Sequence, residues 1–354
     1  MDYKLTIFRT KKKIIIFYAL ALLLSFCAYA VNAQKTSGGY GESYLLRDIG
    51  ARPIAMAGAY SAIANEPTAI FYNPAGLDAF GNRPQITSMF SFLEFGRTHS
   101  AIAWGQSFFE NIGFGFGINS YSTGSFVARD IMGRPLGDYT NWQFSLVGGA
   151  SYSIEFASFG ASLKYLSNNL LNSGVCADGI AVDIGSKFNV MNLFTFALAI
   201  QNASGYMWWD TQSEETQLLP FTIRTGIAME YGLNDDTYIA RDPVTGEAEQ
   251  RFIPASRYIL MGIDAIFTQH ENGPTVTLGI EAVPHEIIAF RGGIALLGDD
   301  MGEVKLFPMT VWGGGFSIRP EIEDLPVFFI DYGISADHLA SNGVAHHIAL
   351  FFEF

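Results

Sequence analysis

Single ionisable side chains near the middle of apolar segments are the residues of this chain that could do chemistry. They are Lys164, Asp183, Arg224, Asp264, Glu281, Arg291 and Asp331. A catalytic acid and base must reach one substrate, but these carboxylates are spread over many segments and form no local motif. The mixture of positive and negative charges instead predicts ion pairs between neighbouring segments. We therefore expect a non-enzymatic protein without catalytic residues.

Metal and thiol chemistry have little support in the sequence. His346 and His347 are adjacent, so on a strand they point to opposite faces and cannot bind one metal ion. The segment Asn234–Asp236 lacks the repeated acidic loop of a calcium site, which favours a solvated turn. Cys176 is the only cysteine after residue 33, so no intramolecular disulfide is expected. The other histidines have no ligand spacing: His99, His270, His285 and His338. We expect no metal and no cofactor.

The segments that carry the charges alternate with the two-residue period of a β-strand. In Thr275–Val283, the residues Val276, Leu278 and Ile280 share one face, while Thr277 and Glu281 share the other. Tyr258–Phe267 and Phe221–Tyr231 repeat this pattern. The sequence therefore predicts strands with one apolar face and one face that carries charge and glycine.

Such segments can be followed to the end of the chain. Their ranges are 84–95, 97–108, 111–121, 140–154, 156–168, 179–190, 193–202, 219–232, 255–268, 273–283, 286–297, 305–318, 324–337 and 343–354. Fourteen is an even number, as bacterial single-chain barrels require. The chain is 49% hydrophobic and 16% charged, yet no apolar run after residue 33 approaches 18 residues. These features predict an all-β protein, a transmembrane antiparallel β-barrel of about 14 strands whose charges face the lumen.

The connections between these segments predict two unlike ends of the barrel. With the N-terminus inside, the connections 122–139, 169–178 and 203–218 fall on the outer end. The connection 233–254 is long but falls on the inner end, either as a hairpin extension or because a strand upstream is miscounted. Loop 203–218 carries an apolar cluster that could contact a hydrophobic ligand or a partner protein, or could belong to the interfacial aromatic girdle. The cluster consists of Tyr206, Met207, Trp208 and Trp209.

The first residues predict export. A basic stretch precedes the apolar run 14–29, and Val31–Ala33 is a small-residue cleavage site, so residues 1–33 are predicted to be a cleaved signal peptide. A retained anchor is the alternative, but the run is shorter than the roughly 20 residues a helix needs to span. Residues 1–33 contain five basic and one acidic residue, so the remainder has net charge −17 against −13 for the whole chain. Nucleic acid is not expected as a partner of so acidic a chain.

Residues 34–83 are predicted to form a hatch inside the barrel, and residues 84–354 to form the barrel itself. Small residues dominate 51–77, where they allow close backbone packing, and Asn73–Gly76 supplies a turn. The alternating Gly113, Gly115 and Gly117 present glycine to the lumen, so we expect them to accept the hatch against the wall.

The chain ends on a strand with one aromatic and aliphatic face formed by Ile348, Leu350, Phe352 and Phe354. A C-terminal aromatic resembles the signal by which outer-membrane proteins are recognised, so Phe354 is expected to contact the barrel-assembly machinery. Outer-membrane lipid and lipopolysaccharide are the other expected partners, and the cell outer membrane is the expected location.

Three stretches, 50–52, 55–60 and 71–77, resemble the N-terminal signature of the PorV/PorQ family and of its larger relatives, the FadL-type transporters. The resemblance implies a hatch inside a 14-stranded outer-membrane barrel, with the Asn-Pro-Ala box at Asn73 buried. Ala57 departs from the second glycine that many relatives carry. The hatch residues carried over are Arg52, Met56, Gly58, Tyr60, Asn73, Pro74 and Gly76.

Two functions fit this resemblance. In the favoured one, the barrel resembles PorV/PorQ proteins and assists type IX-like protein secretion, with secretion-machinery subunits or cargo as partners. In the alternative, it resembles FadL-type proteins and passes hydrophobic small molecules such as fatty acids or aromatic compounds. Compactness favours secretion, because barrel and short hatch leave little chain for elaborate loops. In either case we expect Arg52, Asn73 and Pro74 inside the barrel against Asp264, Glu281 or Asp331.

Overall fold

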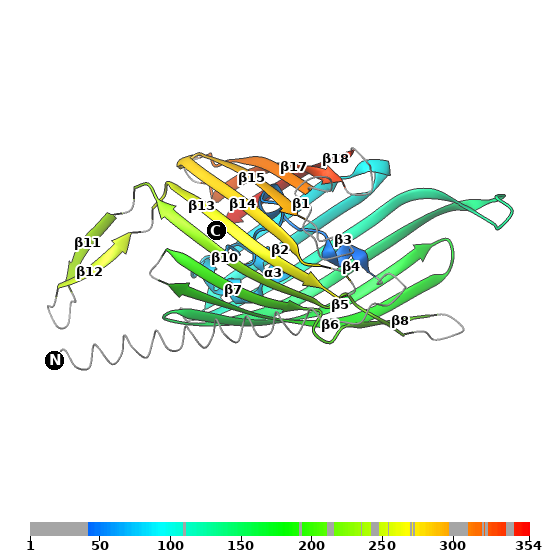
Figure 1. Cartoon of the computed structure of the whole chain (residues 1–354), viewed down its shortest axis with the longest axis horizontal. Helices are drawn as coiled ribbons and strands as arrows, with labels where there is room; N and C mark the ends of the chain where they lie inside the picture. The colour runs from blue at the N-terminus through cyan, green and yellow to red at the C-terminus, as the bar shows by residue number, and fades with distance from the viewer. Residues whose placement is uncertain are drawn as a thin grey trace.

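The computed structural model describes most of the chain from residue 42 onward (Figure 1). The residues outside its description are 1–41, 109–110, 191–192, 211–215, 235, 242–247, 254, 270, 272, 297–310, 321, 323–324 and 338–342. The predicted signal peptide therefore lies outside the described residues, as do His270, His338 and Asp235. In the described part of the chain, no helix is long and apolar enough to cross a bilayer.

Fourteen antiparallel strands close into a barrel, which confirms the predicted fold class. The strands are β1 (Gln85–Phe92), β2 (Thr98–Phe108), β3 (Ile112–Arg129), β4 (Pro135–Ile154), β5 (Ala157–Leu171), β6 (Val175–Val190), β7 (Phe194–Gln201), β10 (Thr222–Gly232), β13 (Tyr258–Thr268), β14 (Thr275–His285), β15 (Ile288–Leu296), β16 (Val311–Ile318), β17 (Val327–Asp337) and β18 (Gly343–Glu353). Neighbours in sequence pair throughout, and β1 pairs with β18 to close the wall. Closure pairs the first strand with the last, which satisfies backbone groups that would be costly to leave unpaired in a membrane.

The strands place alternate residues inside and outside, as their two-residue period dictates. In β14, Glu281 is fully buried in the lumen, whereas its neighbour Ile280 is 46% exposed on the outer face. The outer face carries large apolar side chains throughout, such as Phe114, Leu163 and Ile263. An apolar exterior around a polar interior is the arrangement of a transmembrane barrel.

The wall is far longer on one side than on the other (Figure 1). Strands β3 to β6 form two long hairpins whose tips define what we call the loop end of the barrel. The opposite end, with the short connections at 155–156 and 286–287, we call the turn end. The sequence prediction of a loop over 122–139 was wrong, since β3 runs to Arg129 and β4 starts at Pro135. A shift of register between Ser122 and Ser125 interrupts the alternation, which is why the strand is not visible in the pattern.

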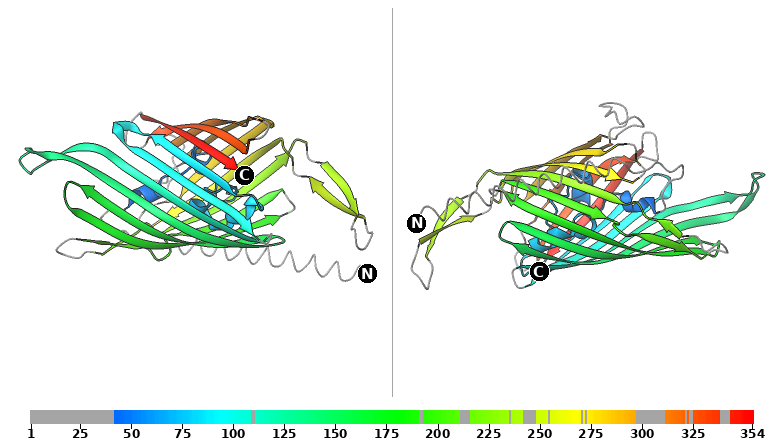
Figure 2. Two further views of the ribbon diagram at one scale, coloured as in Figure 1. Left: turned by 180° about the vertical axis from the view of Figure 1, so that it is seen from behind. Right: turned by 60° about the horizontal axis from the view of Figure 1, so that its bottom comes forward.

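A separate hairpin accounts for the long connection 233–254. Strands β11 (Asp236–Arg241) and β12 (Ala248–Ile253) pair with each other and, within the described residues, with no barrel strand. Its base is fixed to the turn end, since Arg257 Nε donates to the carbonyl of Pro284 at 2.8 Å. Figure 2 shows the hairpin projecting from that end. Of the two alternatives, the hairpin extension is therefore the correct one.

The wall between β6 and β10 is built from a broken strand. Strand β7 pairs with β6 up to Ile200, and the chain then bends at Asn202, whose φ is 54°. Two short strands, β8 (Tyr206–Trp209) and β9 (Thr216–Leu218), continue the sheet toward the loop end. The bend is held by Asp183, whose carboxylate accepts the Asn202 backbone N–H at 2.8 Å and pairs with Lys164 at 2.7 Å.

The chain before β1 lies within the lumen as short helical turns joined by bends (Figure 1). They are η1 (Ser43–Leu46), α2 (Ala51–Ala55), α3 (Ala69–Tyr72) and η2 (Pro74–Phe80). Helix α2 packs on β15 to β18, and η2 packs on β2 to β6. The elements are short because glycine and proline interrupt them, as at Gly58, Pro67 and Pro74. We refer to residues 50–80 as the hatch.

Candidate functional site: the hatch and the lumenal cavity

Inward-facing glycines on most barrel strands meet the hatch. A Cβ atom on Gly113 would overlap the carbonyl of Leu77, and one on Gly160 would overlap Pro74. On the opposite wall, Gly293 meets Met56 and Gly313 meets the carbonyl of Ile54. The prediction that glycines 113, 115 and 117 accept the hatch is confirmed, since they face Leu77, Ile70 and Phe71. Because the backbones approach this closely, the hatch fits the wall around nearly its whole circumference.

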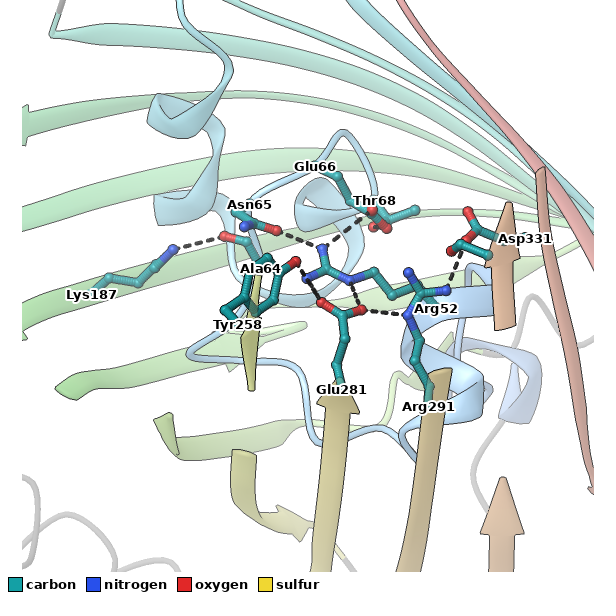
Figure 3. A network of polar contacts seen from close by, with 11 residues as sticks. Arg52, Ala64, Asn65, Glu66, Thr68, Lys187, Tyr258, Glu281, Arg291 and Asp331 are labelled. Atoms are coloured by element: carbon teal, nitrogen blue, oxygen red, sulfur yellow. Dashed lines mark hydrogen bonds and ion pairs between the residues drawn. The ribbon is translucent and has the colours of Figure 1, made fainter. Parts of the chain in front are cut away.

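An ion-pair network joins the hatch to the wall at Arg52 (Figure 3). Arg52 donates from Nε and Nη2 to the two oxygens of Glu281, each at 2.8 Å. Glu281 also accepts from Arg291 and, at 2.9 Å, from the hydroxyl of Tyr258. Arg291 in turn binds Asp331 at 2.8 Å. The four charged groups are buried, and the bidentate geometry offsets the desolvation of the charges.

The other side of the Arg52 guanidinium faces the hatch itself. Its Nη1 donates to Asn65 at 2.7 Å and approaches Glu66 at 3.5 Å. Lys187 of β6 lies close to this turn and donates to the backbone carbonyl of Ala64 at 2.8 Å. The turn 64–66 is therefore tied to both walls of the barrel.

A second network holds the middle of the hatch. Asp264 accepts hydrogen bonds from the backbone N–H groups of Tyr60 and Ser61, at 3.2 and 2.9 Å, and from the Ser61 hydroxyl. Arg224 donates to the carbonyl of Gly58 at 2.7 Å and to the Ser61 hydroxyl at 3.1 Å. The two charged groups are 3.6 Å apart. Gly58 has φ 81°, a conformation that glycine adopts readily and other residues resist.

The Asn-Pro-Ala box caps η2 and contacts a different part of the wall. Asn73 is fully buried and accepts the N–H of Ala75 at 3.1 Å. Its amide donates to the carbonyls of Ser61 and Ser186, at 3.1 and 3.2 Å. Arg52 thus lies against Glu281 as expected, whereas Asn73 and Pro74 lie against β5 and β6 rather than against the expected carboxylates.

The remaining predicted hatch residues are packing positions. Met56 and Tyr60 are completely buried, and Gly76 allows the carbonyl of Ala64 to approach. Burial raises the pKa of Tyr60 well above its usual value, so this phenol is neutral. Among the predicted lumenal charges, Lys164 and Asp183 pair with each other at the strand break and contribute nothing to holding the hatch in the described contacts.

A cavity of about 450 Å³ remains between the hatch, the segment 43–49 and the wall toward the loop end. This lumenal cavity has apolar side chains, including Leu46, Ile49 and Ile54, beside cationic and polar ones. The guanidinium of Arg47 lies over the ring of Tyr121 at 5.6 Å, and that of Arg224 lies over Tyr72 at 5.1 Å. Its volume is within the range of pockets that hold a small organic ligand.

The segment that borders the cavity is anchored by Glu42. Its carboxyl accepts a hydrogen bond from the amide of Asn168 at 2.5 Å. Burial raises the pKa of this carboxyl to about 7, although the hydrogen bond from Asn168 opposes the shift. Tyr44 packs beside it against the inner face of the long strands.

The apolar cluster of loop 203–218 is divided between the two faces of the wall. Tyr206 and Trp208 point outward and contact each other, with ring centroids 6.0 Å apart. The cross-strand register puts Tyr206 beside Ile180 and Tyr165, and the outward ring of Tyr165 touches Phe144. Met207 is buried against the inner wall, and Trp209 is partly buried. An aromatic band at one level of the outer face marks a membrane–water interface.

Several residues at the cavity were not singled out in the sequence. Arg47, His99 and His347 border it, and Arg97 pairs with Asp337 near its rim. His99 bonds Asn119 at 2.6 Å, and His347 lies between Ser91 and Ser335. Both histidines occupy inward positions of the two-residue alternation on β2 and β18, so the sequence pattern could have placed them in the lumen. Within the described residues, no three His, Cys, Asp or Glu side chains gather as metal ligands would.

Comparison with family models gives no match, and comparison with curated proteins gives none. Solved structures do match over most of the chain. The toluene transporter TbuX of Ralstonia pickettii has a TM-score of 0.53 and 16% identity, over 88% of this chain and 100% of that one. The monoaromatic hydrocarbon channel CymD has a TM-score of 0.56 and 12% identity, over 89% and 99%. A FadL homologue of Pseudomonas aeruginosa has a TM-score of 0.53 and 10% identity, over 86% and 96%. At such identities the likeness shows a FadL-like barrel fold.

Proposed function

We propose that this protein is a non-enzymatic outer-membrane channel through which hydrophobic small molecules pass without an energy source. The observation that carries the proposal is the lumenal cavity, which is large enough for a small ligand and mixes apolar side chains with a few polar ones. The similar barrels of known structure are channels for toluene and other monoaromatic hydrocarbons, which supports transport over the secretion role favoured by the sequence.

The fold also supports a location in the outer membrane. A closed barrel with short turns at one end and long hairpins at the other follows the pattern of outer-membrane barrels, whose short turns lie in the periplasm. The final residue, Phe354, donates its backbone N–H to the carbonyl of Pro84 at 3.1 Å, beside the closing strands β1 and β18. We propose in addition that the barrel-assembly machinery recognises this residue.

Uptake of radiolabelled toluene by cells that lack their own hydrocarbon channels tests the proposal. Expression of the chain should accelerate uptake, and Ala295→Phe should reduce it several-fold, because Ala295 lies at the cavity and a ring there fills it. Gly292→Phe is the matched control on the same strand, since Gly292 points outward into open space. Uptake no faster than in empty cells, together with a block in protein export on deletion, would reject transport in favour of secretion.

A further inference from the structure

The two helical parts of the hatch leave one wall strand between them. Helix α2 packs mainly on β15 to β18, and η2 packs mainly on β2 to β6. Strand β1 lies between these two groups, since it pairs with β18 on one side and with β2 on the other. It contains no glycine, whereas the hatch meets glycines on β2 to β6, on β10 and on β13 to β17. At β1 the hatch therefore meets side chains of the wall rather than its backbone.

Met89 is the side chain that fills this position. It is buried, and its sulfur accepts the backbone N–H of Gly50, the first residue of the hatch, at 2.9 Å. The register places it between Ala101 of β2 and Ala349 of β18. We call these three residues the methionine row. Met89 is the only large side chain of the row.

The lumenal cavity extends to the row just before the methionine row. Two residues nearer the loop end on β1, Ser91 pairs with His347 on one side and with His99 on the other. Both histidines border the cavity, and the three residues of the methionine row do not. The methionine row is the next inward row toward the turn end, about 7 Å along the strand. A ligand that leaves the cavity along β1 must therefore pass Met89.

Aromatic side chains lie on the other side of the methionine row. Phe351 is the next inward residue of β18 after Ala349, and its ring stacks on that of Phe329 with the centroids 4.9 Å apart. The guanidinium of Arg319 lies over the Phe329 ring at 4.5 Å. Phe351 is buried, whereas Phe329 is partly exposed. An aromatic molecule that has passed Met89 thus meets rings on which it can stack.

Elsewhere the hatch is fixed by contacts that are harder to displace. Its backbone lies against Gly113 of β3 and Gly160 of β5. On β14, Glu281 binds Arg52 through buried charges. Met89 differs from these contacts, because an unbranched thioether changes its rotamer readily and its sulfur is a weak acceptor.

We propose that ligands pass the hatch along β1, where Met89 changes its rotamer, and that the size of this side chain limits the size of the molecule that passes. The proposal rests on the transport function proposed above and gives it a route. The backbone of the hatch stays in place, and Gly50 loses only the sulfur acceptor while a ligand passes. A thioether followed by stacked phenyl rings suits an aromatic hydrocarbon.

Uptake of radiolabelled toluene and of the larger naphthalene by whole cells tests this route. Met89→Ala should raise the ratio of naphthalene to toluene uptake about tenfold, since even one methylene in a pocket can change selectivity by that much. Met89→Trp should slow the uptake of both. Leu260→Ala is the matched control, because Leu260 is also an apolar inward residue with 5% exposure, but on β13. It should leave the ratio unchanged.

Met89→Cys, in a Cys176→Ser background, allows the route to be closed reversibly. Benzyl methanethiosulfonate brings a small arene to the thiol and leaves a benzylthio group on it as a mixed disulfide. Toluene uptake should then fall several-fold and return on reduction, because the group fills the space between hatch and wall. Leu260→Cys in the same background should keep its uptake after the same treatment. Intact mass measures how far each thiol has reacted.

The outcomes separate this route from the transport function itself. Wild-type uptake no faster than in empty cells would reject the transport function and the route with it. Normal wild-type uptake that neither Met89→Ala nor Met89→Trp alters would reject the route alone. An unreacted Met89→Cys thiol in a barrel that takes up toluene would reject it too, as would equal effects of the Leu260 variants. The heat-dependent shift of barrels on gels verifies that each variant folds.

Discussion

Glu281 neutralises two guanidinium groups at once, Arg52 of the hatch and Arg291 of the wall. Glu281→Gln would leave both cations buried with too little negative charge. We expect the free energy of unfolding to fall by about 3–5 kcal/mol, the usual effect of removing one partner from a buried ion pair. Urea titration of the barrel in detergent micelles measures it.

The control for Glu281 is Arg83→Ala. Arg83 binds Glu353 at 3.2 Å, but its side chain is 67% exposed, so the loss should stay below about 1 kcal/mol. Equal effects of the two substitutions would mean that the Arg52 network does not stabilise the hatch.

Glu42 makes the stability of the segment beside the cavity depend on pH. Its pKa is raised from 4.5 to about 7 by burial, so the folded protein holds this proton where the unfolded chain releases it. Its contribution to stability is therefore complete below pH 4.5 and is lost as the pH rises through 7, by at most about 3 kcal/mol. Proteolysis of the segment 42–49 should accelerate from pH 5 to pH 8. In Glu42→Gln the rate should be the same at both values, and an unchanged dependence in that variant would assign it to another group.

At the residue scale, the sequence located the charges but not their partners. Alternation placed Glu281, Asp264 and Asp331 inward because a strand exposes every second residue to the lumen. Asp264 and Asp331 meet cations of other wall strands, whereas the contact of Glu281 with Arg52 depends on the path of the hatch, a chain of small residues without periodicity. For this reason Arg52 was correctly expected at a lumenal carboxylate, whereas Asn73 was placed on the wrong wall. Lys187 and His99 were not predicted, because an inward position on a strand does not tell whether a polar side chain contacts the hatch, as Lys187 does, or a neighbouring strand, as His99 does.

At the element scale, the glycines make the wall and hatch a single packed unit. Gly113→Ala places a methyl group against the carbonyl of Leu77, and Gly160→Ala places one against Pro74. Backbone cannot rotate away as a side chain does, so each variant should lose about 1–3 kcal/mol of stability. Gly148→Ala, which meets open space, should stay within about 0.5 kcal/mol. Thermal midpoints on gels rank the three, and equal midpoints would contradict the close fit.

The elements were predictable wherever the period of two was unbroken. The segments at β13 and β14 match their predicted ranges closely, because one face meets lipid and the other meets the hatch. The part of β3 beyond Ser122 was not predicted, because a register shift and the exposure of both faces remove the period of two. The connection that holds the hairpin β11–β12 was left open, and within the described residues this hairpin pairs with no barrel strand.

At the scale of the whole molecule, the fit of the hatch bears on how a ligand could pass. Moving the hatch as a body would break the Arg52 and Arg224 networks together and expose buried charges. It would also separate glycine contacts on both sides of the lumen. We therefore expect passage by side-chain rearrangement around a hatch that stays in place.

A disulfide between hatch and wall tests this expectation. A Cβ on Gly279 would lie 3.1 Å from the Cβ of Ala59, slightly closer than the roughly 3.5–4.5 Å of a relaxed disulfide. Ala59→Cys/Gly279→Cys, in a Cys176→Ser background, should crosslink after a small shift of the hatch at Met56, whose Cβ and carbonyl oxygen would lie 2.8 and 2.9 Å from the new Cβ. The oxidised barrel should take up toluene at the rate of the reduced one, because the lock restrains a segment that does not need to leave. Uptake that stops on oxidation and returns with reductant would show that the hatch itself must move, and the buried ion pairs would then be its latch rather than its permanent anchor.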